Sequence, residues 1–203
     1  MPQKYFRVKL ASPASRVPRS RKEMDGKILI TGCAKTGTTL VRRLFNAFDL
    51  KVFNKSEISL GKLIKSDCDV GKRGSTTVFS NLLEEKELRR QIALIEKHNI
   101  RVVNIVRDKA STLKSTNGYV TEERYDECMR QARELSQHID YTINYSDLIS
   151  SPDNVQGAVS KALNLKIIHK WSGFPDWFDD SEELDDGCLD IDIYRLRRIG
   201  EEV

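Results

Sequence analysis

Apolar and polar residues alternate along the chain in a pattern that predicts strands and helices following one another. Residues 28–31 (ILIT) form a short apolar run with β-branched residues, which is typical of a buried strand. After a glycine-containing loop, apolar residues recur at helical spacing and predict a helix through Leu40, Val41, Leu44, Phe45 and Phe48. Residues 51–53 predict a second short strand. Residues 57–75, which contain three glycines, predict an irregular or partly helical segment.

The second half of the chain continues the same alternation. Strands are predicted at residues 76–80, 101–106 and 139–145, and the run RVVNIV at 101–106 is the clearest of them. Helices are predicted at residues 84–98, at residues 122–138 and from Pro152 to about Leu163, because proline favours the first turn of a helix. Strands that alternate with helices are typical of βαβ units. We therefore predict an α/β fold, with a parallel β-sheet flanked by helices on both faces.

The distribution of charge predicts three regions within the 203 residues. Residues 1–25 hold seven Lys and Arg against two acidic residues and predict a basic N-terminal arm. Residues 26–175 contain the alternating strands and helices and predict one α/β domain. Residues 176–203 predict an acidic C-terminal tail, since residues 176–192 hold nine acids and no Lys or Arg. Because no aromatic stacking pattern accompanies the basic arm, we expect a solvated arm, able to dock on the acidic tail, and no nucleic-acid partner.

Composition narrows the class of protein. Hydrophobic residues make up 39% of the chain and charged residues 32%, with a net charge of +4, which excludes a chain disordered throughout. No apolar run approaches the roughly 20 residues of a membrane helix, and the N-terminus lacks the apolar segment of a secretory signal. We expect a cytoplasmic protein without a membrane partner. The four cysteines form no CxxC pair, so we expect reduced thiols and neither a zinc site nor a disulfide framework.

The sharpest chemical feature lies between the first predicted strand and the first predicted helix. The chain there reads Gly32-Cys33-Ala34-Lys35-Thr36-Gly37-Thr38-Thr39. Glycines allow the backbone to turn so that successive N–H groups point at one anion, and the helix N-terminus adds partial positive charge. Lys35 adds a full charge, and Thr38 and Thr39 add hydroxyl donors. The sequence therefore predicts a phosphate-binding loop.

This loop is not a standard Walker A motif, because Gly37 is followed by Thr38 and the lysine lies earlier in the loop. The string AKTGTTL, from Ala34 to Leu40, instead resembles the PKSGTTW/L loop of sulfotransferases that use 3′-phosphoadenosine 5′-phosphosulfate (PAPS). In that family the loop grips the 5′-phosphosulfate. The resemblance implies a P-loop-like sulfotransferase architecture and cofactor contacts from Lys35, Thr36, Gly37, Thr38, Thr39 and Leu40.

Two later segments resemble the same family in the same order. In VVNIVRDKASTLKS, Arg107 follows a strand and Ser115 stands eight positions on, as in the family's site for the 3′-phosphate of PAPS. An arginine fork suits a phosphate, and a serine hydroxyl adds a donor. The stretch INYSDLISSPDNV resembles the family's strand ending in tyrosine before a proline-initiated helix. This implies that Tyr145 lies beside the adenine.

Transfer to a hydroxyl requires a base that removes its proton. Many cytosolic relatives use a histidine upstream of the 3′-phosphate arginine, but Asn81 stands at that position and cannot act as a base. Glycan-modifying members carry a glutamate at a similar distance after the loop lysine. The resemblance therefore implies Glu57 as catalytic base beside Lys35, with Asp67 and Asp69 as further candidates.

These observations predict a PAPS-dependent sulfotransferase that acts on a hydroxyl of a carbohydrate or small-molecule acceptor, with a glycan among the candidates. The spent cofactor would be 3′-phosphoadenosine 5′-phosphate, and no metal is required. Two alternatives stay open. One is a P-loop kinase of a small metabolite, for which Asp108 would take the place of the acid that ends a Walker B strand. The other is a catalytically silent nucleotide-binding module.

Overall fold

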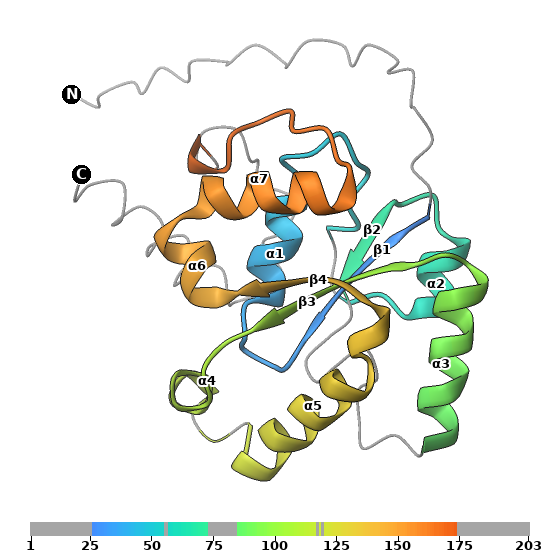
Figure 1. The fold of residues 1–203 in the computed structure, drawn as a ribbon, viewed down its shortest axis with the longest axis vertical. Coiled ribbons are helices and arrows are strands. Elements are labelled where there is room, and N and C mark those ends of the chain that lie inside the picture. Colours follow the sequence, from blue (N-terminus) through green and yellow to red (C-terminus); the bar gives the residue numbers. More distant parts are fainter. Residues whose placement is uncertain (1–25, 55–56, 73–84, 117, 119, 174–203) are drawn as a thin grey trace, which may run out of the picture.

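The computed structural model describes residues 26–54, 57–72, 85–116, 118 and 120–173, and these residues are built around one parallel sheet (Figure 1). Its strands are β1 (Ile28–Gly32), β2 (Val70–Lys72), β3 (Arg101–Val106) and β4 (Ile139–Asn144). They lie in the order β2-β1-β3-β4, and every neighbouring pair is parallel. The predicted α/β class with a parallel sheet is confirmed. The basic arm, the acidic tail, Asn81 and the strand expected at 76–80 lie outside the described residues.

The helices occupy the connections between strands and follow the last strand. Their bounds are α1 Thr38–Phe45, α2 Leu60–Lys65, α3 Glu85–Lys97, α4 Lys109–Thr116, α5 Glu122–Glu134, α6 Tyr145–Ser150 and α7 Pro152–Leu163. Two short 3-10 turns follow α5 and α7, at Ser136–His138 and Trp171–Gly173. None of the described helices is long and apolar enough to cross a membrane.

Alternate residues of each strand point to two separate cores. On β1, Ile28 and Ile30 pack against α1, α6 and α7, whereas Leu29 packs against α2 and α3. On β3, Val103 faces the first core and Val102 the second, as the twofold repeat of a strand requires. Figure 1 shows α1, α6 and α7 on one side of the sheet and α2 and α3 on the other. Helices therefore cover both faces.

The order of the strands places connections on opposite sides of β1. The chain leaves β1 for β2 on one side and then returns to β3 on the other side of β1. The segments that follow β1 and β3 therefore diverge at the carboxyl end of the strands, which is where open parallel sheets bind ligands. The loop predicted to bind phosphate follows β1, and Arg107 follows β3.

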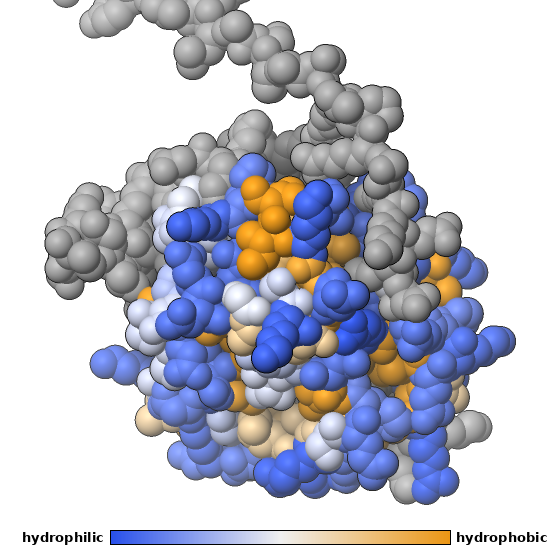
Figure 2. Space-filling model, turned by 45° about the horizontal axis from the view of Figure 1, so that its top comes forward, coloured by the Kyte–Doolittle hydropathy of each residue, from blue (hydrophilic) through white to orange (hydrophobic). Residues whose placement is uncertain are grey.

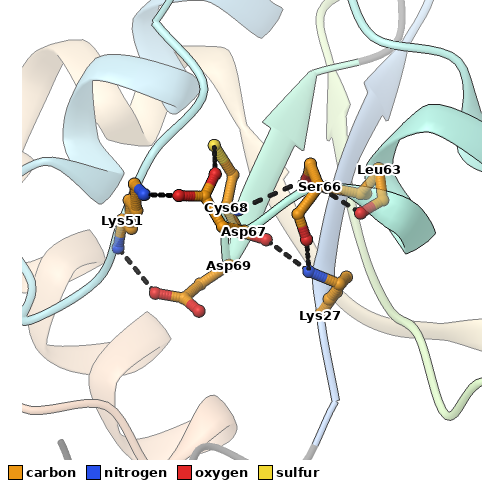
Figure 3. Close-up of polar contacts among 7 residues, drawn as sticks. All are labelled: Lys27, Lys51, Leu63, Ser66, Asp67, Cys68 and Asp69. Carbon is orange, nitrogen blue, oxygen red and sulfur yellow. Dashed lines mark hydrogen bonds and ion pairs between the residues drawn. The ribbon is translucent and has the colours of Figure 1, made fainter.

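The opposite, amino edge of the sheet is held by side chains that reach the backbone. Arg101 donates from Nη1 and Nη2 to the carbonyl oxygens of Leu163 and Ala162, at 2.8 and 2.9 Å. Lys27 donates to the carbonyl oxygens of Ser66 and Cys68, as Figure 3 shows. These contacts join the starts of β1 and β3 to elements on both faces of the sheet.

The structure differs from the sequence interpretation between residues 51 and 75. Val52 forms one isolated parallel bridge to Val70, and the strand expected at residues 51–53 does not extend beyond this bridge. The segment expected to be irregular or partly helical contains helix α2, as expected, and also the edge strand β2, which was not expected. The hydrophobic pattern does not reveal strand β2, because Val70 is its one large apolar residue. Gly71 allows the strand to pack closely, since a Cβ at this position would lie 2.4 Å from Ile58.

Two boundaries also differ in the second half of the chain. The helix expected at 122–138 ends at Glu134 and tightens into the 3-10 turn, so that buried Leu135 joins the core of α2 and α3. Strand β4 ends at Asn144, and Tyr145 is the first residue of α6 instead of the last residue of the strand.

The segment after α7 also packs onto the domain. The amide of Gln156 accepts the N–H of Trp171 and donates to the carbonyl oxygen of His169, at 3.0 and 2.7 Å. The Trp171 side chain is buried in the core of α1, α6 and α7. Figure 2 shows a mainly hydrophilic face with apolar residues gathered between the charged ones. Among large apolar residues in the described part, Ile167 is exposed, at 40%.

Candidate phosphate-binding site

The loop after β1 has the backbone conformation of a tight anion-binding turn. Lys35 and Gly37 both have positive φ, at 62° and 104°. Gly37 is the N-cap of α1 and offers no side-chain cap to the first turn of that helix. Since the first N–H groups of an α-helix have no partner within the helix, α1 presents donors and partial positive charge at this point.

Gly37 lies directly under the ring of Tyr145. A Cβ at this position would be 2.7 Å from Cδ2 of Tyr145 and 3.1 Å from Cδ1 of Ile105. The loop after β1 and the start of α6 therefore meet only because residue 37 has no side chain. Gly32 is similarly tight, with a Cβ position 2.7 Å from the carbonyl oxygen of Ile105.

The threonines of the loop have different roles. The hydroxyl and the N–H of Thr36 both donate to the carbonyl oxygen of Cys33, at 2.6 and 3.2 Å, so this buried residue holds the loop in shape. Thr38 is 8% exposed, and Thr39 is partly buried. The side chain of Leu40 lies in the core. The backbone is therefore the part of Leu40 near the carboxyl edge of the sheet.

Arg107 joins the three strand ends. Its Nη1 donates to the carbonyl oxygen of Lys35 at 3.2 Å, and its guanidinium lies over the Tyr145 ring, 4.3 Å from the centroid. Cation–π stacking of this kind orients the guanidinium. The structure thus brings Lys35, Arg107 and Tyr145 together.

Ser115 lies outside the group formed by Lys35, Arg107 and Tyr145. It is exposed in the last turn of α4, and its hydroxyl donates to the carbonyl oxygen of Thr112 at 2.8 Å. Ser111, one turn earlier, lines the cavity beside Arg107. The sequence pattern singled out Ser115, whereas the serine of α4 that the structure brings to the cavity is Ser111.

A cavity of about 590 Å³ opens beside the loop, between β3, β4 and α5. It is lined by Val106, Arg107, Asp108, Ser111, Tyr125, Asn144, Tyr145, Ser146 and Ile149. This volume lies within the usual range for small-molecule sites. The cavity therefore has room for a small organic ligand beside Arg107.

Two ionisable groups in this cavity have shifted pKa values with structural causes. The N–H of Ser111 donates to Asp108 Oδ1 at 2.8 Å, which lowers the pKa of the Asp108 carboxyl and makes it the cap of α4. Burial raises the pKa of Tyr125, whose hydroxyl donates to the carbonyl oxygen of Arg107 at 2.7 Å. Both residues thus fix the backbone that follows the arginine.

Lys72 is a site residue that sequence reasoning missed. It ends β2, is only 6% exposed, and donates from Nζ to Thr39 Oγ1 at 2.9 Å. Its register partner on β1 is Ile30, two residues before the loop begins. A buried ammonium at this position adds positive potential beneath the first turn of α1. A lysine at the end of a strand beside the loop would have indicated this role, but β2 is too short to be recognised from the sequence.

Glu57 lies at the same edge of the sheet. The next residue, Ile58, donates its N–H to the carbonyl oxygen of Lys72 at 2.9 Å. The chain at Glu57 thus runs past the end of β2, and its side chain is exposed. Its assignment as base stays a prediction.

The alternative bases Asp67 and Asp69 are wrong. They precede β2 at the amino edge, where Asp67 pairs with the Lys51 ammonium and Asp69 accepts the Lys51 N–H at 2.7 Å (Figure 3). The carbonyl oxygen of Asp69 also accepts the N–H of Ile28, at the start of β1. These carboxylates are therefore separated from the loop by the length of the strands.

Replacing Gly37 with alanine should destabilise the fold. The left-handed backbone alone costs roughly 1–2 kcal/mol for a residue with a Cβ, and the overlap with Tyr145 adds to it. The matched control is Gly157→Ala on the exposed side of α7, where nothing lies within 4 Å. This control should stabilise the protein by about 0.5–1 kcal/mol. Urea unfolding measures both, and equal effects would contradict the loop geometry.

Comparison with known proteins adds no family to these observations. No protein-family model matches the chain, and no curated protein sequence matches it either. The interpretation of the site therefore rests on its own residues and on the geometry described above.

Proposed function

We propose that this chain is a PAPS-dependent sulfotransferase with a P-loop-like sulfotransferase architecture, acting on a hydroxyl acceptor. The observation that carries the proposal is the convergence of Lys35, Arg107 and Tyr145 at the carboxyl edge of the sheet. These residues come from three segments far apart in the sequence. Each matches the same family resemblance in the sequence.

The residues present fit a nucleotide with phosphate groups at both ends. The glycine turn and the N-terminus of α1 suit one anionic group, and the fork of Arg107 suits a second. The cavity beside Arg107, lined in part by Tyr125, Tyr145 and Ile149, offers an aromatic and partly apolar surface. A nucleoside would lie there, in a cavity of about 590 Å³.

When bound, PAPS supplies the sulfuryl group and a phosphate leaving group. Lys35 would stabilise the charge that develops on the leaving phosphate, since preorganised cations lower the energy of such transition states. Lys72 would hold the Thr39 hydroxyl in place and strengthen the positive potential of the loop. Glu57 would accept the proton of the acceptor hydroxyl.

A kinase of a small metabolite has less support. The residue that would take the Walker B position, Asp108, already caps α4 through the Ser111 N–H. Binding of ATP with Mg²⁺ in preference to 3′-phosphoadenosine 5′-phosphate, measured by isothermal titration calorimetry, would support the kinase and contradict the sulfotransferase. Nucleotide binding without transfer to any phenol, alcohol or sugar acceptor would favour the silent module.

Arg107→Ala should weaken binding of 3′-phosphoadenosine 5′-phosphate while barely changing binding of adenosine 5′-phosphate. A charge-assisted contact contributes about 1.5–3 kcal/mol, which is a loss of roughly 10- to 150-fold in affinity. Arg130→Ala, which removes the same charge from the surface of α5, is the control and should change neither affinity. Equal losses for both nucleotides would remove Arg107 from the 3′-phosphate site.

Lys35→Ala should reduce sulfuryl transfer by roughly 10²–10³-fold, as expected when one preorganised electrostatic contact is removed. Unfolding by urea should be little changed, because the Lys35 side chain is exposed. Lys51→Ala, at the amino edge of the sheet, should retain activity. A folded Lys35→Ala protein with the transfer rate of the wild type would refute the role of this lysine.

Glu57→Gln should leave nucleotide affinity unchanged and lower transfer by roughly 10²–10⁴-fold. Glu96→Gln is the control, because Glu96 lies near His138 at the amino edge. An unchanged rate in Glu57→Gln would show that another group is the base.

A further inference from the structure

One tyrosine of α5 contacts both the loop after β1 and the backbone of Arg107. The side chain of Tyr125 is 7% exposed and belongs to a small buried cluster with Cys33 and Ala34 of the loop. Its hydroxyl donates to the carbonyl oxygen of Arg107 at 2.7 Å. Tyr125 therefore joins the two segments to which the proposed function assigns the two anionic groups of the ligand.

A buried tyrosine is well suited to hold two segments at a fixed separation. Its side chain is a rigid ring placed by only two torsions, and the surrounding cluster restricts both of them. Burial also raises the pKa of Tyr125, so its hydroxyl stays protonated at neutral pH and continues to donate. The bond to the Arg107 carbonyl oxygen is therefore present under the conditions in which a nucleotide would bind.

Helix α5 is also joined to α4, which begins two residues after Arg107. The ammonium group of Lys109, the first residue of α4, pairs with Glu122 and Asp126 of α5 at 3.1 and 2.9 Å. The Tyr125 hydroxyl thus comes from a helix that other contacts also hold beside Arg107. Removing this hydroxyl should therefore leave α5 in place and take one support away from the arginine.

We propose that Tyr125 is a positioning residue that holds the Arg107 fork at a fixed separation from the loop, so that the site selects ligands with two anionic groups over ligands with one. This inference rests on the proposed function, which gives the loop and the fork one anion each. The guanidinium itself is directed by its stacking on Tyr145 and its bond to the Lys35 carbonyl oxygen. Tyr125 fixes the backbone from which that side chain extends.

This support acts on selectivity more than on binding in general. A ligand with one anionic group on the loop does not need Arg107 in a set position. A ligand with a second anionic group gains the charge-assisted contact in full only when the fork is already in place, because ordering it during binding costs affinity. The ring of Tyr125 also lines the cavity, and phenylalanine keeps that surface, so Tyr125→Phe isolates the effect of the hydroxyl.

The test compares nucleotide affinities of the full chain by isothermal titration calorimetry. Tyr125→Phe should weaken binding of 3′-phosphoadenosine 5′-phosphate by about 3- to 10-fold, as expected for one hydrogen bond, and leave binding of adenosine 5′-phosphate unchanged. Tyr125→Met, which also lacks the hydroxyl, is a second variant in case the phenylalanine protein does not fold. Ser160→Ala is the matched control, because it removes another hydroxyl-to-carbonyl bond of 2.7 Å, to Leu165, and should change neither affinity. Equal losses for both nucleotides, or no loss for either, would overturn the proposal.

Nuclear magnetic resonance of the Arg107 side chain gives a second readout that needs no ligand. The guanidinium lies 4.3 Å from the centroid of the Tyr145 ring, so the ring should shift its Nε–H resonance upfield, and Arg107→Ala identifies that resonance by its loss. The upfield shift should shrink in Tyr125→Phe and persist in Ser160→Ala, whereas an unchanged resonance in Tyr125→Phe would refute the positioning role. If the wild type binds neither nucleotide, the proposed function fails, while this resonance still decides whether Tyr125 positions Arg107.

Discussion

The contact between the Tyr145 ring and the Gly37 backbone is the constraint on which the candidate site depends. With a Cβ position only 2.7 Å from the ring, residue 37 has room for hydrogen alone, and its φ of 104° sets the entry into α1. The ring in turn carries the Arg107 guanidinium, which reaches back to the Lys35 carbonyl oxygen. Loop, arginine and tyrosine therefore form one closed set of contacts.

Electrostatics divides the sheet into two unlike edges. Lys35, Lys72 and Arg107 gather at the carboxyl edge, together with the N-terminus of α1. At the amino edge, carboxylates such as those of Asp67, Asp69 and Asp140 are paired with lysine, arginine or backbone N–H groups. In the proposed function, the cations at the carboxyl edge would attract the anionic ligand.

The sequence was sufficient to predict the parts of this arrangement that have strong local patterns. Strand β3, the loop between β1 and α1, and helix α7 lie where periodicity, glycine spacing and Pro152 predicted them. Strand β2 was not predicted, because its three residues owe their position to neighbours on β1 and not to their own periodicity. The role of Lys72 was missed for the same reason. The choice between Ser111 and Ser115 depends on how α4 leaves Arg107, which spacing alone does not determine.

The side chains of Arg101 and Lys27 stabilise the sheet at the amino ends of its strands. Both reach backbone carbonyl oxygens, which belong to every residue whatever its side chain, so these ties survive substitution of their acceptors. The framework is thereby anchored at the amino ends of its strands. Substitutions in the segments that follow the carboxyl ends of the strands leave these ties unbroken.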